Sequence, residues 1–170
     1  NLVMAGGVAL NCVANGRLLR EGIFEKIWIQ PAAGDAGGAL GAAYAVHHIW
    51  HQQERHIKSD GSDMMQGSYL GPEFSNIDVQ RLCRKYQAQA HYFDNFADLA
   101  TNVAVLLASA QIVGWCQGRM EWGPRALGGR SILADPRHPE MQKKLNLKIK
   151  YREGFRPFAP SVLAEHAQDY

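Results

Sequence analysis

A short apolar run that ends in glycine and leads into a helical pattern occurs twice near the start of the chain. Residues 2–5 read Leu-Val-Met-Ala and run into Gly6-Gly7, and the apolar residues 26–30 run into Pro-Ala-Ala-Gly-Asp-Ala-Gly-Gly. Strands that alternate with helices are typical of parallel strands packed against helices. The pattern therefore predicts an α/β fold, with a glycine-containing turn at the carboxyl end of each strand.

Hydrophobic periodicity extends this pattern along the chain. Strands are expected at residues 2–5, 26–30, 90–93, 112–116, 131–134 and 158–163. Helices are expected at residues 8–20, 36–55, 76–86, 98–109 and 139–149. The polar stretch 57–70, rich in Gly, Ser and Asp, is expected to be a linker. It would separate a first domain, 1–56, from a second, 71–170.

Composition narrows the class of protein. Hydrophobic residues make up 46% of the chain and charged residues 20%, which is enough for a packed core. The longest apolar run, 103–115, is too short to span a bilayer, and no signal peptide is visible, so we expect a cytoplasmic protein without a membrane partner. Cys12, Cys83 and Cys116 show no CxxC spacing, which fits a reducing compartment. Because Asn1 opens directly onto an apolar strand, we expect a fragment of a longer protein.

The two glycine turns are candidates for binding a nucleotide. Where a strand leads into a helix, free backbone N–H groups and the positive helix end face the same place, and glycine lets a phosphate approach. The competing explanation is that these are ordinary turns that need glycine for their shape alone. Because two such turns follow one another, nucleotide binding and the ordinary turn are equally well supported. Asp35, at the start of the second helix, is either an N-cap or a ligand of a divalent cation. The cluster of His47, His48 and His51 is attributed to a solvated helix end.

A glycine- and arginine-rich loop, residues 117–130, carries the strongest signal. Each arginine offers a planar fork of donors that matches phosphate oxygens, and several on one loop can converge on a small dianion. The glycines would let backbone N–H groups add to these donors. Glu121 would hold one arginine or accept an N–H from a bound amide. A solvated basic loop is the alternative, but nearby acids are few and Trp122 suggests packing, so the loop indicates an anion site.

Basic residues also concentrate beyond this loop. Residues 114–156 carry a local charge of +6, while the rest of the chain carries −4. Such a field favours an anionic ligand. Residues 148–161 alternate charged residues with aromatics and prolines, and present Lys150, Arg152 and Arg156. A nucleic-acid surface could look like this, but the net charge is only +2 and no nucleic-acid module is visible, so a small anion fits better.

Catalysis through a covalent intermediate finds no support in the sequence. Ser131 and Ser161 lack a nearby histidine, and Cys116 lies in a predicted strand without a histidine or lysine beside it. The inventory suits a reaction that depends on positioning and on charge stabilisation at phosphates.

Several segments resemble the O-carbamoyltransferases of antibiotic and nodulation-factor pathways. The most specific is Gln-Gly-Arg-Met-Glu-Trp-Gly-Pro-Arg-Ala-Leu-Gly-Gly-Arg-Ser-Ile-Leu-Ala-Asp-Pro-Arg at residues 117–137. Further segments of the same pattern are residues 5–16, 30–43, 70–75 and 151–163. The resemblance implies the end of an ASKHA-type domain joined to the first part of a YrdC-like α/β domain. It also implies an enzyme that makes carbamoyl-adenylate from carbamoyl phosphate and ATP and passes the carbamoyl group to an acceptor hydroxyl.

The resemblance assigns roles to individual residues. It implies a carbamoyl-phosphate and adenylate region at Arg119, Glu121, Arg125, Arg130 and Ser131, with Lys150, Arg152 and Arg156 as further substrate contacts. It implies nucleotide loops at Gly6, Gly7, Asn11, Gly37 and Gly38. Asp35 matches the family's metal-binding aspartate, with iron expected and magnesium as the alternative. The family's metal-binding histidines have no counterpart in this sequence, so Asp35 would be one ligand of several.

Three questions stay open at the level of sequence. A tRNA-modifying threonylcarbamoyl enzyme shares both folds, although residues 118–125 argue against it. A non-catalytic nucleotide- or anion-binding module is the alternative outside the enzymes. The acceptor could be a sugar or an antibiotic-like molecule, and an oligomer is compatible with the sequence. No nucleic-acid partner is expected.

Overall fold

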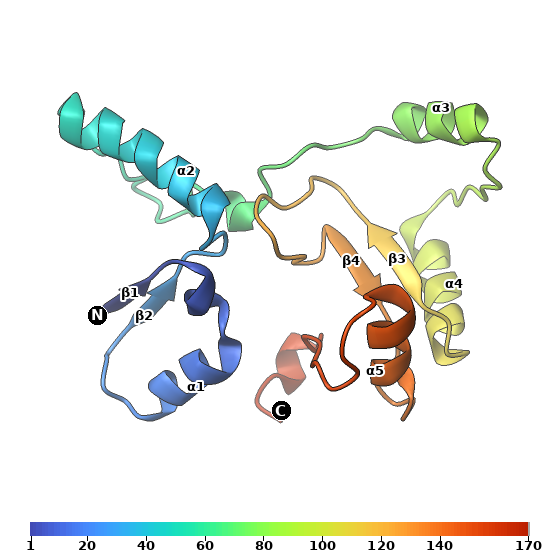
Figure 1. Cartoon of the computed structure of the whole chain (residues 1–170). Coiled ribbons are helices and arrows are strands. Elements are labelled where there is room, and N and C mark those ends of the chain that lie inside the picture. The colour runs from blue at the N-terminus through green and yellow to red at the C-terminus, as the bar shows by residue number, and fades with distance from the viewer. Residues whose placement is uncertain (170) are drawn as a thin grey trace. The chain divides into compact units, whose positions relative to one another are not determined.

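A computed structural model describes residues 1–169, which fall into two compact units (Figure 1). Unit 1 comprises residues 1–89 and 115–131, and unit 2 comprises residues 90–114 and the described residues from 132 onward. Tyr170, the last residue of the predicted second domain, lies outside the described residues. The division into compact units does not test the domain boundary predicted at residues 57–70. That boundary remains a prediction.

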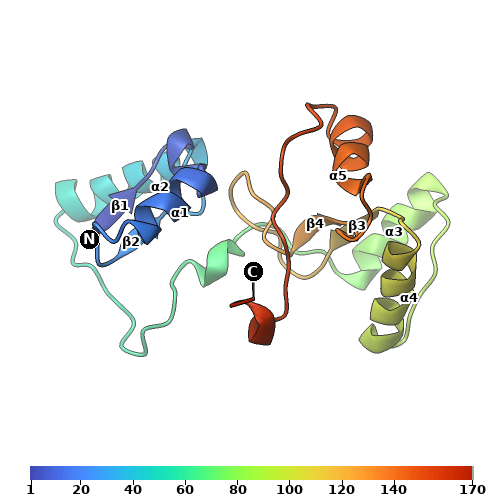
Figure 2. The ribbon, with the colours of Figure 1, turned by 90° about the horizontal axis from the view of Figure 1, so that it is seen from below.

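Unit 1 begins with two parallel strands. β1 (Leu2–Met4) pairs with β2 (Ile27–Ile29) in a register that sets Val3 opposite Trp28. Both strands lie where the sequence predicts them. Parallel strands need a crossover between them, and the intervening chain is largely helical. Figures 1 and 2 show α1 and α2 on opposite sides of the strand pair.

The crossover holds two helical segments instead of the one predicted at residues 8–20. A 3-10 turn spans Gly7–Leu10, and α1 spans Cys12–Arg20. Asn11 divides them, because its backbone is extended and its side chain accepts a hydrogen bond from the Ala14 N–H at 3.2 Å. An asparagine that satisfies a free N–H in this way starts a new helix.

After β2 the chain enters α2 (Asp35–Tyr44), which continues as a wider helical segment over Ala45–Trp50. The helix therefore ends five residues before the predicted end at residue 55. A long polar segment follows and includes a 3-10 turn at Gln66–Ser68, where Ser68 is fully buried. The predicted linker thus ends in packed structure.

The remaining elements are mostly those predicted. α3 (Asn76–Tyr86) begins with a capping box between Ser75 and Asp78. α4 (Phe96–Ala108) is capped by the Asn95 side chain. β3 (Val113–Cys116) and β4 (Arg130–Leu133) form a second two-stranded sheet, and the glycine- and arginine-rich loop connects them.

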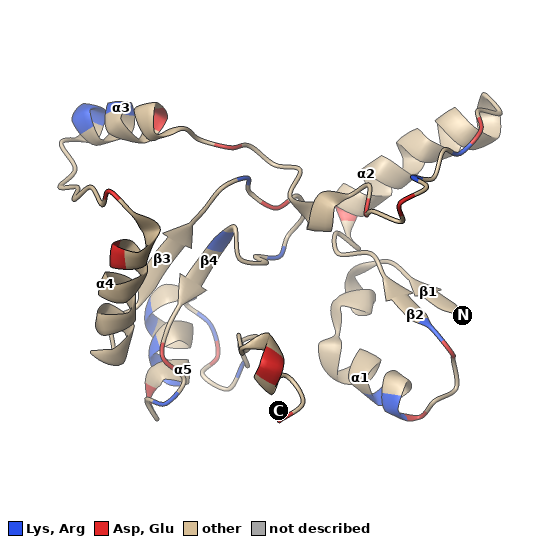
Figure 3. Ribbon diagram, turned by 180° about the vertical axis from the view of Figure 1, so that it is seen from behind, with Lys and Arg blue, Asp and Glu red and all other residues tan. Residues whose placement is uncertain are grey.

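Unit 2 contains α4, the short α5 (Met141–Lys144), a helical turn at Leu145–Ile149 and a 3-10 turn at Ala164–His166. The last turn of α5 contains two basic residues, Lys143 and Lys144, and Figure 3 colours the lysines and arginines of the ribbon blue. The strands predicted at residues 90–93 and 158–163 are wrong, because neither segment pairs with another strand in the described part of the chain. A strand needs a neighbour to satisfy its backbone, which an apolar run alone cannot supply.

Few side chains are fully buried. Among the residues that the structure describes, the buried apolar ones are Ala9, Ala32 and Ala33 in unit 1 and Met141 and Leu145 in unit 2. Large apolar side chains lie in solvent, among them Val8 at 82% exposure and Trp50 at 81%. None of the helices within residues 1–169 has the length and apolar character needed to cross a membrane. The architecture is mixed α/β, as predicted, and its strands form two small sheets.

Candidate functional site

The loop between β3 and β4 folds around the side chain of Glu121. This residue is 2% exposed, and its Oε1 atom accepts hydrogen bonds from the backbone N–H groups of Leu127 at 2.5 Å and Gly129 at 2.7 Å. The Arg130 N–H donates to the same atom at 3.4 Å. A single carboxylate oxygen therefore closes the loop upon itself.

Burial raises the pKa of Glu121, but the backbone N–H groups of Leu127, of Glu121 itself, of Gly129 and of Arg130 together lower it by more. The net pKa lies below the ordinary value of 4.5, so the carboxylate is ionised at neutral pH. Its second oxygen, Oε2, is buried, has no hydrogen-bond partner among residues 1–169, and lies 3.6 Å from Nε of Arg130. The charge of Glu121 is thus balanced by backbone N–H groups and one guanidinium.

Arg130 is held by the loop itself. Its Nη2 atom donates to the Gly123 carbonyl, and its Nε faces Glu121, which is one of the two roles predicted for that acid. Backbone N–H groups of this loop were expected to add donors to a bound anion, but those of Leu127 and Gly129 donate to Glu121 instead. Sequence composition could not reveal this, because it does not show which acceptor reaches the N–H groups first.

Arg119 lies at the edge of an open pocket of about 340 Å³. Its Nη1 donates to the Gly71 carbonyl at 2.7 Å, and its Nη2 lies 3.5 Å from Oε2 of Glu73. The residues that line the pocket are Tyr69, Gln117, Arg119, Gly128 and Gly129. The Tyr69 hydroxyl donates to the Leu127 carbonyl at 2.6 Å, which joins the pocket wall to the Glu121-centred loop.

The three arginines of the loop do not converge on one point. Arg119 lines the pocket, Arg130 is turned toward Glu121 and Gly123, and Arg125 is exposed without a side-chain partner within residues 1–169. Ser131 lies in β4 and is half-buried. Of the arginines, Arg125 is the one that offers a free guanidinium for an incoming anion.

The two predicted glycine turns contact one another. The Gly6 N–H donates to the Ala33 carbonyl at 2.6 Å, and Gly6 has a φ of 91°, which a side chain rarely tolerates. A Cβ atom on Gly37 would lie 2.1 Å from the Ala32 carbonyl oxygen, so this glycine allows the close approach of turn and helix. Gly7 and Gly38 face open space.

These contacts separate the five residues predicted to bind a nucleotide into two groups, those used in contacts within the protein and those with open space beside them. The Gly6 N–H, the Asn11 side chain and the Gly37 backbone serve contacts within the protein. Gly7 and Gly38 leave room for a ligand next to their backbone.

Asp35 is the first residue of α2 and does not cap it. The N-cap position belongs to Gly34, which makes no side-chain cap, and the exposed Asp35 carboxylate has no hydrogen-bond partner in the described chain. The capping alternative for Asp35 is therefore wrong, and its carboxylate is available to a cation. Across residues 1–169, no three His, Cys, Asp or Glu side chains come together as a metal site.

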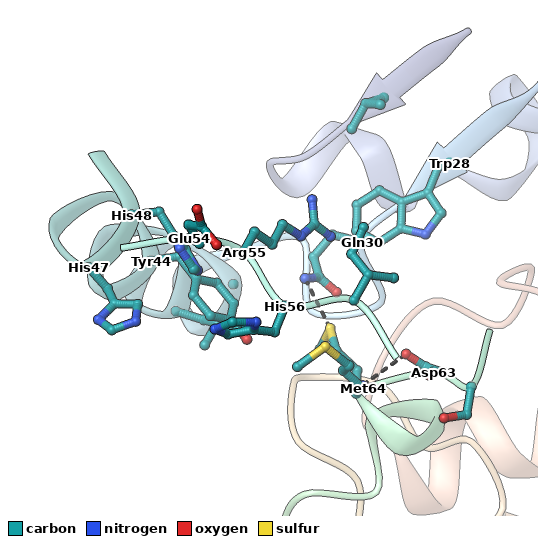
Figure 4. Close-up of a pocket in the computed structure, with 17 residues that line it drawn as sticks. Trp28, Gln30, Tyr44, His47, His48, Glu54, Arg55, His56, Asp63 and Met64 are labelled. Atoms are coloured by element: carbon teal, nitrogen blue, oxygen red, sulfur yellow. Dashed lines mark hydrogen bonds between the residues drawn. The ribbon is translucent and has the colours of Figure 1, made fainter. Parts of the chain in front are cut away.

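A larger pocket, of about 840 Å³, lies between α2 and the polar segment that follows it (Figure 4). Trp28, Tyr44 and His48 line it together with residues of the 54–57 and 62–65 segments. The His48 ring stacks on Tyr44 with centroids 5.5 Å apart. Sequence reasoning missed this pocket, although the spacing of Tyr44 and His48 on one helix face was the available signal.

The predicted basic residues of unit 2 have separate environments. The Nε atom of Arg152 donates to Oδ1 of the buried Asn146 at 2.7 Å, and its guanidinium lies 5.0 Å from the centre of the Phe158 ring. Arg156 pairs with Glu153 at 3.0 Å on the surface. Lys150 is exposed. Arg152 therefore stabilises its own turn. Of the three basic residues, Lys150 is the one whose exposed side chain has no ion-pair partner among residues 1–169.

The geometry so far defines an α/β protein with a packed, arginine-bearing loop beside a small open pocket. A family model described as Carbamoyltransferase N-terminus matches residues 1–44, and one described as Carbamoyltransferase C-terminus matches residues 104–170. The chain belongs to the carbamoyltransferase family, and the resemblance drawn from the sequence is confirmed. The glycine turns fall in the first match, and the Glu121-centred loop falls in the second.

Similar proteins occur in several bacteria. An uncharacterized protein of Synechocystis is 61% identical over the whole chain, which covers 28% of that protein. The nodulation protein NolNO of Sinorhizobium fredii is 44% identical over 99% of the chain and 24% of its own length. Nodulation protein U of Rhizobium fredii is 40% identical over 99% of the chain and 26% of its own length. The chain thus spans about a quarter of the length of these relatives.

Proposed function

We propose that the chain is part of an enzyme that transfers a carbamoyl group from carbamoyl phosphate to a hydroxyl of a small-molecule acceptor. The reaction passes through carbamoyl-adenylate made with ATP. Overall, one water is consumed, and phosphate, pyrophosphate and AMP are released. The observation that carries the proposal is the arginine-bearing loop, which belongs to the carbamoyltransferase match and borders an open pocket.

In this proposal, the carbamoyl donor is bound through the charge and position of arginines in the loop. Arg119 at the pocket edge and the free guanidinium of Arg125 bind the phosphate oxygens of the donor or the adenylate. Glu121 and Arg130 keep the loop in shape, so that the donors need not rearrange during the reaction. Ser131, in β4, adds a polar contact on the side of this loop. Within unit 2, Lys150 is a further contact for a substrate anion, and Arg152 and Arg156 support the turn that carries it.

In the same proposal, ATP and the divalent cation bind at the glycine turns. Gly7 and Gly38 leave their backbone accessible to ATP, and Gly6, Asn11 and Gly37 fix the shape of the turns around them. The Asp35 carboxylate fits one position in the shell of a divalent cation, iron or magnesium. When bound, such a cation would polarise an oxygen of the carbamoyl or phosphoryl group.

The fold and acceptor belong to the same proposal. We assign residues 1–56 to an ASKHA-type nucleotide domain and residues 71–170 to a YrdC-like domain, with the acceptor a sugar or an antibiotic-like molecule. Two relatives bear the name nodulation protein, which favours an acceptor in nodulation chemistry. Release of product that depends on added tRNA would favour a threonylcarbamoyl enzyme instead.

The test uses a full-length carbamoyltransferase that contains this sequence. We expect it to release pyrophosphate from ATP only when carbamoyl phosphate is present. Arg125→Ala should lower that rate by about 100-fold, because the removed guanidinium stabilises developing charge. The exposed Arg81→Ala on α3 is the matched control and should leave the rate unchanged.

The 170-residue chain on its own should bind ligand weakly and show no turnover. Turnover by this chain alone would contradict the expectation that the metal site needs ligands besides Asp35 that this sequence does not supply. Wild-type protein of full length that releases pyrophosphate at the same rate with and without carbamoyl phosphate would overturn the proposed function.

A further inference from the structure

Gly123 of the Glu121-centred loop is in contact with the turn that precedes α2. A Cβ atom on Gly123 would lie 2.9 Å from the Cβ and 3.3 Å from the Cα of Ala32, closer than side chains approach one another. Ala32 is fully buried, and Gly123 has a φ of 111°. Both residues belong to unit 1, so the contact lies within one compact unit. The loop and the turn therefore fit together only because residue 123 lacks a side chain.

The same turn is fixed on two further sides. The Ala32 carbonyl oxygen lies where a side chain on Gly37 would be, at 2.1 Å, and the Ala33 carbonyl accepts the Gly6 N–H at 2.6 Å. Ala33 is 4% exposed. Residues 32 and 33 are thus packed against α2, the first glycine turn and the loop at once. A close-packed turn of this kind has no slack, so a shift of the loop moves it.

We propose that the contact between Gly123 and Ala32 is a positioning joint. Through it, the loop matched to the C-terminal part of the family sets the position of the glycine turns matched to the N-terminal part. Gly123 reaches the nucleotide only through Ala32 and its neighbours, so it is a positioning residue. The inference rests on the proposed function, which places the nucleotide at these turns.

The chain offers a matched control for the backbone strain. Gly128 lies in the same loop with a φ of 112°, almost the same as that of Gly123. The nearest atom to a Cβ on Gly128 is the Tyr69 hydroxyl oxygen, at an ordinary 3.4 Å. Both positions have nearly the same positive φ, which disfavours alanine at either one, whereas only Gly123→Ala pushes on Ala32. The difference between the two variants therefore isolates the joint.

The test measures binding of a non-hydrolysable ATP analogue to full-length wild type, Gly123→Ala, Gly128→Ala and the pairs of each with Ala32→Gly. We expect Gly123→Ala to weaken analogue binding at least tenfold relative to Gly128→Ala. Ala32→Gly should recover a large part of that loss in Gly123→Ala, because it removes the opposing methyl group, and should recover none in Gly128→Ala.

The outcomes separate this inference from the proposed function. Equal losses in the two single variants, or no recovery with Ala32→Gly, would overturn the joint while leaving carbamoyl transfer intact. A wild type that binds no ATP analogue would overturn both. If Gly123→Ala does not fold, Ala32→Val puts the extra bulk on the other side of the contact without backbone strain. Normal analogue binding by a folded Ala32→Val protein would contradict the joint.

Discussion

Glu121 carries a buried charge that is matched by its own loop. Its Oε1 accepts three backbone N–H groups, and Arg130 faces its Oε2. Burying an ion is costly unless donors replace the lost water. Because these donors lie within nine residues of Glu121, one side chain decides whether the segment is ordered.

Replacing the carboxylate tests this role. We expect Glu121→Gln to lower the free energy of unfolding by about 1–3 kcal/mol, because the amide places a donor opposite the Arg130 guanidinium and removes the charge. Urea unfolding of the full-length protein measures the change. Glu73→Gln is the control, since its pair with Arg119 is exposed and should contribute less than about 1 kcal/mol. Equal effects of the two substitutions would contradict the role of Glu121.

The loop should also respond to acid. The pKa of Glu121 is lowered in the folded protein, so its stabilising contribution is complete above the ordinary value of 4.5. That contribution is lost as the pH falls through the lowered pKa. The amide protons of Leu127 and Gly129, followed by NMR, should titrate below pH 4.5 in wild type and not in Glu121→Gln. A midpoint above 4.5 would show that the donors do not outweigh burial.

Among the elements, α2 contains two adjacent glycines with opposite surroundings. A side chain at residue 37 would overlap the Ala32 carbonyl, whereas one at residue 38 meets nothing within 4 Å. The family resemblance assigned both glycines to a nucleotide loop. The structure separates packing from accessibility, which sequence spacing alone does not.

Alanine substitutions should express this difference. Gly37→Ala should destabilise the protein by about 1–3 kcal/mol through overpacking. Gly38→Ala should stabilise it by up to about 1 kcal/mol, because alanine favours the helix. Thermal unfolding measures both. A Gly38→Ala protein that is more stable yet binds ATP more weakly would support a ligand beside residue 38, and unchanged ATP affinity would count against one.

The elements that sequence predicted well are those with local determinants. β1, β2, α3 and α4 follow apolar periodicity, and α3 and α4 begin at the capping residues Ser75 and Asn95. The false strands at residues 90–93 and 158–163 needed a pairing partner, which depends on distant chain. The same limit applied to the site. The arginine-rich loop was recognisable from composition, but the capture of its N–H groups by Glu121 depends on how the loop closes.

At the scale of the whole molecule, few apolar side chains are sheltered. Apart from alanines, the buried apolar residues of the described chain are Met141 and Leu145, whereas Val8, Trp50 and Tyr151 are more than 80% exposed. Large exposed apolar surface favours association with other surfaces. The stability of the chain should therefore depend on what covers these residues.

The 170-residue chain, studied alone, should self-associate. We expect sedimentation velocity to show species larger than the 18.9 kDa monomer, growing with concentration, and a hydrophobic dye to bind strongly. The full-length protein under the same conditions is the control and should bind much less dye per residue. A chain that stays monomeric and leaves the dye unbound would contradict this expectation.

Unit 1 is built from two separate segments of the chain, which matters for the design of hybrid proteins. Residues 1–89 share this unit with residues 115–131, which come from a separate stretch of the chain. A hybrid made by joining the first half of one relative to the second half of another would break up a pair of segments adapted to each other. Exchanging both segments together keeps Ala32 and Gly123 from the same parent. Hybrids in which both segments of unit 1 come from the same parent should retain their fold more often than hybrids with a single junction between residues 89 and 115.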